Sequence, residues 1–218
     1  TTPAAQCPVI DPAWEDPRGV PISAILLGGR RPSVVPLVFE SFNWRHGTFL
    51  GATQASETTA ANMAAVGVVR RDPMAMLPFC GYNMGDYLAH WLSMPGRAAN
   101  AKMPRVFYVN WFRKSSTGKW LWPGFGENCR VLKWIFERIE GSAKAVESPI
   151  GHLPAPGAID TTGLDVSAED MKELLSVDVA GWQKDLPNMR EHFAAMGSRL
   201  PAALKEELDA LEQRLAKA

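Results

Sequence analysis

The aromatic segment at residues 110–128 limits the possible folds of this chain more than any other stretch. Its rings are Trp111, Phe112, Trp120, Trp122 and Phe125. Residues 107–109 before it are aromatic or β-branched, which predicts a strand. Residues 115–118 are polar and end in glycine, which predicts a turn, and residues 120–122 form a second short apolar run. The segment therefore predicts a strand, a turn, a second strand and a glycine loop, with flat side chains gathered at the junction.

A helix is expected directly after this loop. Its apolar residues lie at positions i, i+1, i+4, i+5 and i+8, which form one face of a helix. These residues are Val131, Leu132, Ile135, Phe136 and Ile139. Gly141 follows them, and glycine is common where helices end. Asn128 stands where the N-cap of this helix belongs.

The first part of the chain predicts an irregular segment followed by two strands. Prolines are too dense in residues 1–19 for a regular helix or a central strand, so an irregular connector is expected. Residues 20–27 are almost all apolar and predict a buried strand, and residues 34–40 predict a second. Residues 86–94 carry apolar side chains at helical spacing and predict a buried helix. Residues 51–66 are small and weakly apolar, so burial is expected to stabilise them little.

The last part of the chain, residues 150–218, is expected to be a helical C-terminal subregion. Residues 149–163 contain prolines and glycines and predict a loop. Residues 167–170 resemble a capping box with Asp in the Glu position, which predicts a short helix. Residues 179–197 predict a helix with a break near Pro187. The final helix is amphipathic, with an apolar face of Leu204, Leu208, Leu211 and Leu215.

Flat rings beside a glycine loop suit a nucleobase. Stacking a base on an aromatic ring contributes about 1–3 kcal/mol, and glycine lets the backbone approach a base edge. Arg30 and Arg31 directly follow the first predicted strand, and ligands of α/β sheets bind beyond such strand ends. A guanidinium suits phosphate because it offers paired donors and stays charged. Two alternatives remain open here, namely rings that pack in a core and arginines that are solvated on a turn.

The charges and cysteines exclude several classes of protein. Lys plus Arg and Asp plus Glu both number 23, so there is no basic excess for a nucleic-acid or membrane surface. Cys7, Cys80 and Cys129 form no C-x-x-C pair, which disfavours a zinc site or a disulfide framework and fits a cytoplasmic protein. No apolar run is long enough to span a membrane. A lone His46 beside Gly47 is typical of a structural residue, and no role is assigned to it or to Cys80.

Several blocks of the sequence resemble the C-terminal region of GTP-dependent phosphoenolpyruvate carboxykinases. The strongest are Phe-Tyr-Val-Asn-Trp-Phe-Arg-Lys at 107–114 and Leu-Trp-Pro-Gly-Phe-Gly-Glu-Asn at 121–128. Gln-Cys-Pro at 6–8, Gly-Gly-Arg-Arg-Pro at 28–32 and Asp-Pro-Met-Ala-Met at 72–76 also occur in the family's order and spacing. The resemblance implies an α/β fold, a mixed sheet flanked by helices. It also implies that residues 1–218 are the C-terminal nucleotide-binding domain of a longer enzyme.

The resemblance also implies roles for particular residues. In the family, the first arginine of Gly-Gly-Arg-Arg meets the nucleotide phosphates, which implies this role for Arg30. The implied guanine pocket has Trp111, Phe112, Trp120 and Phe125 as walls, while Asn128 and the backbone of Phe125, Gly126 and Glu127 read the base edge. A mobile lid is implied at residues 51–81, with Ser56, Glu57, Thr58 and Thr59 in it. Ala55 stands where many relatives have arginine, so a lid contact that needs this arginine is not carried over.

The family's reaction converts oxaloacetate and GTP to phosphoenolpyruvate, GDP and CO₂ in gluconeogenesis. The resemblance implies Mn²⁺, and Mg²⁺ with GTP, as cofactors, and a monomeric full enzyme. This sequence has no G-x-x-x-x-G-K-[ST] loop. No catalytic residue or metal ligand is assigned in it, because the family carries these upstream, and the chain alone is expected to be inactive. Two alternatives remain, a catalytically inactive guanine-nucleotide-binding module and a tryptophan-lined carbohydrate- or peptide-binding domain.

Overall fold

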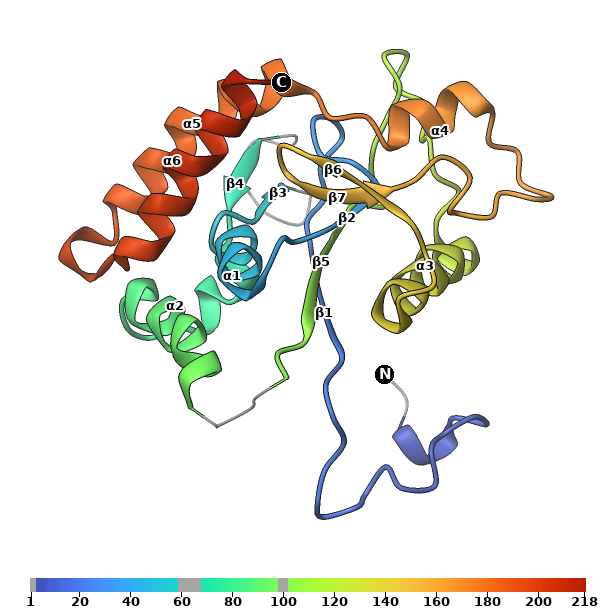
Figure 1. Cartoon of the computed structure of the whole chain (residues 1–218), viewed down its shortest axis with the longest axis horizontal. Coiled ribbons are helices and arrows are strands. Elements are labelled where there is room, and N and C mark those ends of the chain that lie inside the picture. The colour runs from blue at the N-terminus through green and yellow to red at the C-terminus, as the bar shows by residue number, and fades with distance from the viewer. Residues whose placement is uncertain (1–2, 59–67, 98–101) are drawn as a thin grey trace.

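A five-stranded mixed sheet forms the centre of the computed structural model, which describes residues 3–58, 68–97 and 102–218 (Figure 1). The strands lie in the order β1-β5-β2-β7-β6. Their bounds are β1 Ala24–Gly28, β2 Val38–Glu40, β5 Arg105–Val109, β6 Ala145–Ser148 and β7 Gly151–Pro154. The β1–β5 pair is parallel, whereas β2 pairs antiparallel with both β5 and β7. The predicted α/β fold with a mixed sheet is therefore confirmed.

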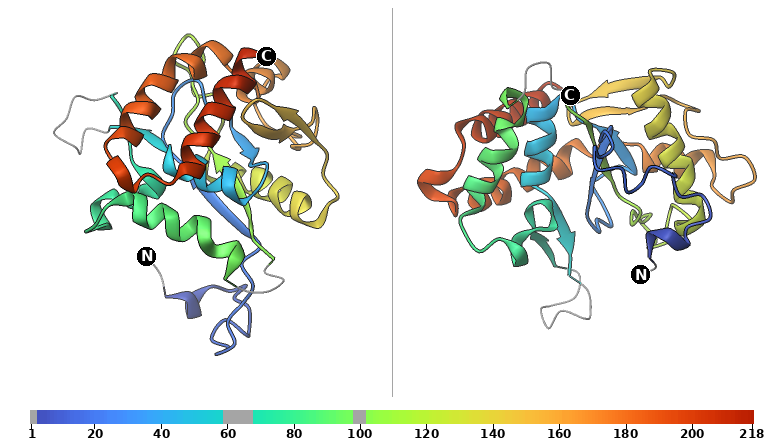
Figure 2. Two further views of the ribbon diagram at one scale, coloured as in Figure 1. Left: turned by 60° about the vertical axis from the view of Figure 1, so that its left-hand side comes forward. Right: turned by 90° about the horizontal axis from the view of Figure 1, so that it is seen from below.

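Helices cover both faces of this sheet (Figure 2). One face is covered by α1 (Trp44–Ala52), α2 (Met84–Ser93), α5 (Val179–Ala194) and α6 (Ala202–Ala216). The other face carries α3 (Asn128–Glu140) and α4 (Ala168–Leu174). Alternate residues of β5 point to opposite faces, so Val106 and Tyr108 join the first core while Phe107 and Val109 join the second. The alternation explains why β5 is almost continuously apolar.

A two-stranded hairpin and several 3₁₀ turns complete the fold. The hairpin pairs β3 (Ala55–Glu57) with β4 (Val69–Arg71). The 3₁₀ turns are η1 Ala4–Gln6, η2 Pro73–Ala75, η3 Leu77–Phe79, η4 Met94–Gly96, η5 Phe125–Glu127 and η6 Gly197–Arg199. Apart from η1, residues 3–19 contain turns and irregular backbone, as the proline density predicts. None of the helices in the described parts of the chain has the length and apolar character needed to cross a bilayer.

Two of the predicted strands differ in the structure. The first begins only at Ala24 and lies at the edge of the sheet, where Leu26 is 40% exposed, so the prediction of a buried strand over residues 20–27 is wrong. The second, at residues 120–122, is reduced to one isolated bridge between Lys114 and Trp120. The turn predicted at residues 115–118, between Lys114 and Trp120, is confirmed, because the Gly118 N–H donates to the Ser115 carbonyl.

The helix after the glycine loop is confirmed, but the role expected for Asn128 as its N-cap is wrong. Gly141 ends α3 in the left-handed conformation with φ of 81°. Glu127 occupies the N-cap position without a side-chain capping bond. The Asn128 side chain instead accepts a hydrogen bond from Trp122 Nε1 at 2.9 Å. The helix after residue 42 was not predicted; α1 begins there because the Asn43 side chain accepts from the N–H of His46.

The region 150–218 is helical only from Ala168 onward. The predicted loop at residues 149–163 contains β7, which lies between β2 and β6 inside the sheet. The capping box is confirmed at Ser167, and α5 continues through Pro187 without the expected break. The apolar face of the last helix is confirmed, because all four of its leucines are buried against α5 and α1.

The segment at residues 51–66 is more buried than its composition predicts. Gly51 and Ala52 belong to α1, and Ala55 begins β3 with no exposed surface. The expectation of little burial is therefore wrong for residues 51–55. In contrast, the predicted helix near residues 86–94 is confirmed as α2, although of its residues only Met84, Gly85 and Leu88 are buried.

Candidate functional site

Residues from three separate segments meet where β1 and β5 end. Because these strands are parallel and Gly28 pairs with Val109, the chain leaves both strands at the same edge of the sheet. A surface pocket of about 330 Å³ opens at this edge. It is lined by Gly28, Gly29, Arg30, Ser56, Val109, Trp111 and Phe112. Four of the residues predicted to bind nucleotide or to belong to the lid, namely Arg30, Ser56, Trp111 and Phe112, are thus brought together.

Arg30 provides a positive charge without a carboxylate partner in the described part of the chain. Its guanidinium lies 4.4 Å from the centroid of the Phe112 ring. A cation–π contact at a partly exposed site contributes about 0.5–1 kcal/mol, less than a bidentate contact with an anion. The geometry therefore keeps the guanidinium in place while leaving its donors available to an anionic ligand.

The Arg30 backbone is joined to the β3 strand of the hairpin. Its N–H donates to Ser56 Oγ at 3.1 Å, and its carbonyl accepts from the N–H of Glu57 at 2.8 Å. Gly29 makes this approach possible, because a Cβ there would clash with the carbonyl oxygen of Ala55. Ser56 and Glu57, predicted as lid residues, therefore contact the arginine loop (residues 29–31). Thr58 follows them with its N–H bonded to the Val68 carbonyl.

Thr59 and residues 60–67 of the expected lid lie outside the described residues.

Asn110 holds the arginine loop and the aromatic segment together, and the sequence analysis missed it. Its side chain is buried, and its Nδ2 donates to the carbonyls of Arg31 at 2.8 Å and Val35 at 2.9 Å. Its Oδ1 accepts from the N–H groups of Arg31 and Phe112, each at 3.2 Å. A polar residue directly after an apolar strand was the signal that could have found it.

Trp120 extends the aromatic surface away from the pocket. Its ring meets the Phe112 ring edge to face, with the centroids 6.0 Å apart. Lys114 Nζ lies 4.3 Å from the Trp120 centroid, so a second cation rests on an aromatic ring here. Trp111 is half-buried and packs partly on the core between the sheet and α3. The alternative of core packing thus describes Trp122, which is buried in this core, and part of Trp111, but not Phe112 or Trp120.

Phe125, Gly126, Glu127 and Asn128 do not line this pocket. Phe125 is 99% exposed and has a positive φ of 40°, which is uncommon for an aromatic residue. Glu127 forms an ion pair with Arg130, with 2.6 Å between Oε2 and Nε. The structure therefore separates the predicted nucleotide residues into an assembled group at the sheet edge and a second group on the η5 turn and at the start of α3.

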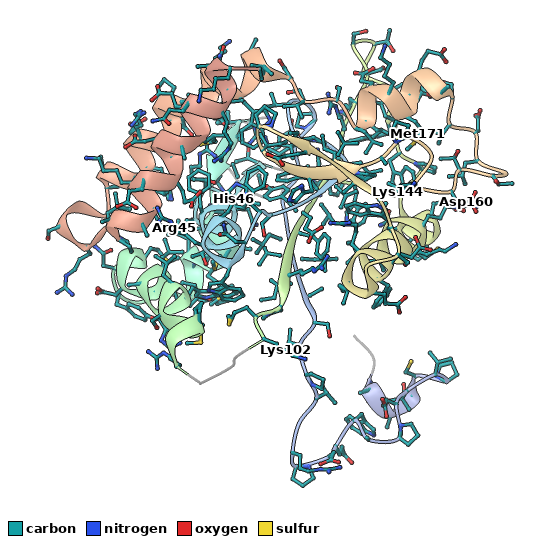
Figure 3. All side chains as sticks on the ribbon, in the orientation of Figure 1. Arg45, His46, Lys102, Lys144, Asp160 and Met171 are labelled. Carbon is teal, nitrogen blue, oxygen red and sulfur yellow. The ribbon has the colours of Figure 1, made fainter. Side chains whose placement is uncertain are left out.

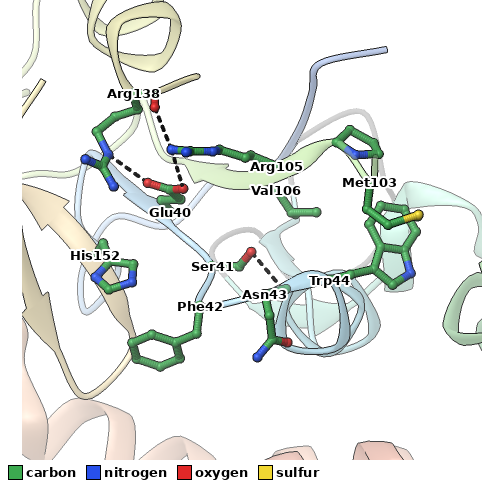
Figure 4. Close-up of a pocket in the computed structure, with 11 residues that line it drawn as sticks. Glu40, Ser41, Phe42, Asn43, Trp44, Met103, Arg105, Val106, Arg138 and His152 are labelled. Atoms are coloured by element: carbon green, nitrogen blue, oxygen red, sulfur yellow. Dashed lines mark hydrogen bonds and ion pairs between the residues drawn. The ribbon is translucent and has the colours of Figure 1, made fainter. Parts of the chain in front are cut away.

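The opposite end of the sheet contains another polar pocket, of about 290 Å³, beside the N-terminal end of β5 (Figure 4). Its arginines are already paired: Glu40 accepts from Arg138 Nε at 2.8 Å and pairs with Arg105 Nη1 at 3.2 Å. This triad joins β2, β5 and α3. The carboxylate of Glu40 can be buried here because it has two cationic partners. The contrast with Arg30, which forms no ion pair with any residue that the structure describes, favours the β1–β5 edge as the functional site.

His46 fits the structural role that a lone histidine suggests. It lies on α1 among the packed side chains next to the sheet (Figure 3), and its Nδ1 accepts from the Phe42 N–H at 3.1 Å. Burial lowers the pKa of His46 from 6.5 to about 3, and the nearby charge of Arg214 acts in the same direction. The ring is therefore neutral at physiological pH.

Candidates for acid–base or metal chemistry are sparse in the described residues. Their His, Cys, Asp and Glu side chains form no group of three or more that could hold a metal ion. Cys7, Cys80 and Cys129 are free thiols. Tyr108 is close to Arg31 and Arg71, but burial raises its pKa, so its hydroxyl stays protonated. What is assembled at the sheet edge is an available cation beside aromatic rings, which suits an anionic ligand.

Comparison with known proteins places the whole chain in one family. Residues 1–214 match the model described as the phosphoenolpyruvate carboxykinase C-terminal P-loop domain. The chain is 54% identical over 217 residues to a phosphoenolpyruvate carboxykinase [GTP] of Treponema pallidum (strain Nichols), covering 99% of the chain and 35% of that protein. It is 56% identical over 209 residues to that of Neocallimastix frontalis (95% and 34%), and 52% identical over 215 residues to a cytosolic one of Gallus gallus (98% and 34%). The chain thus spans about a third of the length of these relatives.

Proposed function

Because the chain belongs to the family of GTP-dependent phosphoenolpyruvate carboxykinases, we propose that it forms the guanine-nucleotide-binding part of such an enzyme. The whole enzyme would convert oxaloacetate and GTP to phosphoenolpyruvate, GDP and CO₂, as a monomer in the cytosol. The observation that carries the proposal is the guanidinium of Arg30, which has no carboxylate partner among the described residues and rests on Phe112 in a pocket beyond β1 and β5. A phosphate chain needs such an available cation.

In this proposal Arg30 binds the nucleotide phosphates, and the aromatic residues bind the base. Trp111, Phe112, Trp120 and Phe125 would form the walls of the guanine pocket, where stacking contributes about 1–3 kcal/mol. The exposed ring of Phe125 would move onto the base when nucleotide binds. The flanking Gly124, with φ of 75°, gives the backbone there a conformation that suits such a rearrangement.

Asn128 would select guanine, together with the backbone of Gly126 and Glu127. Because its Oδ1 accepts from Trp122 Nε1, its Nδ2 is the group left to contact a ligand. An amide donor suits O6 of guanine, which is an acceptor, and opposes the amino group that adenine carries at the same position. A hydrogen bond to buried Trp122 would thus fix the amide orientation that favours GTP over ATP.

The chemical step would depend on groups from the rest of the enzyme. Mn²⁺, and Mg²⁺ with GTP, would stabilise the charges that develop in phosphoryl transfer. The described residues hold no cluster that fits such an ion, so no metal-dependent step is assigned to them. We therefore expect this chain alone to bind nucleotide without turning over oxaloacetate. The lack of a metal-binding cluster among the described residues also fits a second candidate, a guanine-nucleotide-binding module without catalytic activity.

The hairpin next to Arg30 would be the base of a lid. Ser56, Glu57 and Thr58 follow the buried start of β3, and Thr59 continues beyond the described residues. The hydrogen bonds of Ser56 and Glu57 to the Arg30 backbone would link closure to the phosphates. Amide exchange of these residues should slow when nucleotide and substrate bind to the full-length enzyme. Unchanged exchange under saturation would exclude the lid.

A fluorescence titration tests the nucleotide site directly. Trp111 lines the pocket and Trp120 contacts Phe112, so GDP should quench the emission of this chain in a saturable manner, and ADP should not. Arg30→Gln should weaken GDP binding at least about tenfold, the value of one charge-assisted contact of about 1.5–3 kcal/mol. Arg18→Gln is the matched control, because Arg18 is exposed and pairs only with Asp16. Equal quenching by GDP and ADP, or equal affinities of both variants, would refute the assignment.

Turnover separates the enzyme from the inactive module. The full-length protein should form phosphoenolpyruvate from oxaloacetate and GTP, and the 218-residue chain should not. GDP binding without turnover in the full-length protein would instead identify the inactive module.

A further inference from the structure

A buried charge cluster lies behind the arginine loop. Asp185, on α5, is 2.6 Å from Arg71 Nη2 and 3.6 Å from Arg31 Nη2. The side chains are largely removed from solvent, with 6% of Arg71, 9% of Arg31 and 18% of Asp185 exposed. One carboxylate therefore serves two buried guanidinium groups that come from segments far apart in the sequence. Tyr108 lies on the same small cavity.

Arg71 also fastens the hairpin to the end of α1 and to α5. Its Nη1 donates to the Thr53 carbonyl at 2.6 Å, and its Nε donates to Asn188 Oδ1 at 2.8 Å. Arg71 stands opposite Ala55 in the β3–β4 ladder.

Arg31 connects the same cluster to the pocket. Its backbone is held on both sides by the Asn110 amide, and it directly follows Arg30. Arg30 in turn bonds to Ser56 of β3. Asp185 therefore contacts residues of two walls of the pocket. Through Arg31 it holds the arginine loop, and through Arg71 it holds the hairpin.

The carboxylate is what allows the two cations to lie side by side. Without it, two buried guanidinium groups would repel each other with no compensating charge, and removing one partner of a buried ion pair is strongly destabilising. Burial lowers the pKa of Arg71, and the charge of Asp185 opposes that shift. The cluster of Arg31, Arg71 and Asp185 keeps one net positive charge, and it adjoins Arg30, the arginine proposed to bind phosphate.

We propose that Asp185 is a positioning residue for nucleotide binding, which acts by fixing Arg31 and Arg71 and through them Arg30 and Ser56. The inference rests on the proposed guanine-nucleotide site. A purely electrostatic role makes the opposite prediction, because neutralising Asp185 would add positive potential and strengthen phosphate binding. The sign of the effect thus distinguishes the two roles.

The test compares Asp185→Asn and Asp185→Glu with a matched control in the 218-residue chain. Asp209→Asn makes the same change on α6, where Asp209 pairs with Arg190 at the surface. Asp185→Asn should weaken GDP binding about tenfold or more and speed amide exchange at residues 29–31 and 55–57. Asp185→Glu should restore much of both, and Asp209→Asn should change neither. Wild-type or tighter GDP binding by Asp185→Asn, with unchanged exchange, would overturn the proposal.

A second variant keeps the test decisive if Asp185→Asn does not fold. Arg71→Lys retains the charge but loses the fork that contacts Asp185, Thr53 and Asn188 together. It should speed exchange at residues 55–57 and weaken GDP binding in the same direction; unchanged values for both would also overturn the proposal. Failure of the wild-type chain to bind GDP would count against the proposed function, and amide exchange would then decide the positioning role alone.

Discussion

Replacing Asn110 with alanine tests whether one amide assembles the site. The side chain makes four hydrogen bonds, to both backbone groups of Arg31, to the Val35 carbonyl and to the Phe112 N–H. At about 1 kcal/mol for each bond, the loss is about 4 kcal/mol. Buried groups left without partners add to this, and relaxation of the two loops subtracts from it. We therefore expect Asn110→Ala to lower the free energy of unfolding by about 3–5 kcal/mol.

Denaturant unfolding and thermal unfolding measure this effect. For a chain of this size, 1 kcal/mol lowers the melting temperature by about 2–4 °C, so a decrease of about 6–20 °C is expected. Asn110→Asp should be at least as harmful. It keeps the acceptor for Arg31 and Phe112 but places a carboxylate oxygen against the carbonyls of Arg31 and Val35. GDP affinity should fall with both variants.

Asn83→Ala provides the comparison. Asn83 also has a hydrogen-bonded amide, but it caps α2 and bonds to the Met196 carbonyl, and it is not among the residues that line the pocket. It should cost about 1–2 kcal/mol, the usual range of a cap, without changing GDP affinity. A loss below about 1 kcal/mol for Asn110→Ala, with normal GDP affinity, would refute the assembly role.

Three further predictions follow from the same structure. Phe125→Ala should leave the free energy of unfolding within about 0.5 kcal/mol, since the ring is exposed, yet weaken GDP binding by about 1–3 kcal/mol in a titration; equal affinities would contradict the stacking role. Burial lowers the pKa of His46 to about 3, so the unfolded chain binds a proton that the folded chain does not once the pH falls below 6.5. Stability should fall by about 2 kcal/mol from pH 7.5 to 5, and His46→Gln should remove that component; an identical pH profile of the variant would exclude it. Gly29→Ala should lower stability and GDP affinity through the clash with Ala55, whereas Gly81→Ala, with open space around it, should be neutral; equal melting temperatures would contradict the close approach.

The local elements could be predicted where the sequence pattern matches the period of one element. Residues 128–140 repeat with a helical period and end at Gly141, and α3 follows this pattern. The strand β5 is recognised by its β-branched and aromatic residues for the same reason. The helix α1 escaped prediction because its buried face consists largely of small or polar residues, among them Gly47 and Thr48.

Position within the sheet could not be predicted from local pattern. The run at residues 20–27 looks like a buried central strand, yet β1 lies at the edge in the structure. The strand β7 lies near the centre, although its sequence contains Gly151 and Pro154. Pairing partners come from distant parts of the chain, and a single segment does not contain that information.

Some of the residues that line the pocket could be predicted from the sequence, but the residues behind them could not. Arg30, Trp111 and Phe112 belong to motifs, and the parallel strands bring them to one edge of the sheet. Asp185 lies on α5, in the region that was predicted only to be helical. Its role depends on α5 packing across the sheet face, which no local spacing reveals.

The distribution of charge explains how one fold provides both a stable frame and an open site. Glu40 pairs with two arginines at one end of the sheet, and Asp185 pairs with two more behind the pocket. Arg30 and Lys114 instead rest on the rings of Phe112 and Trp120. A carboxylate partner would have to be displaced by an incoming phosphate, whereas a cation on a ring gives up only about 0.5–1 kcal/mol. Aromatic rings therefore serve here as supports that hold a cation without neutralising it, and the same rings remain able to stack on a base.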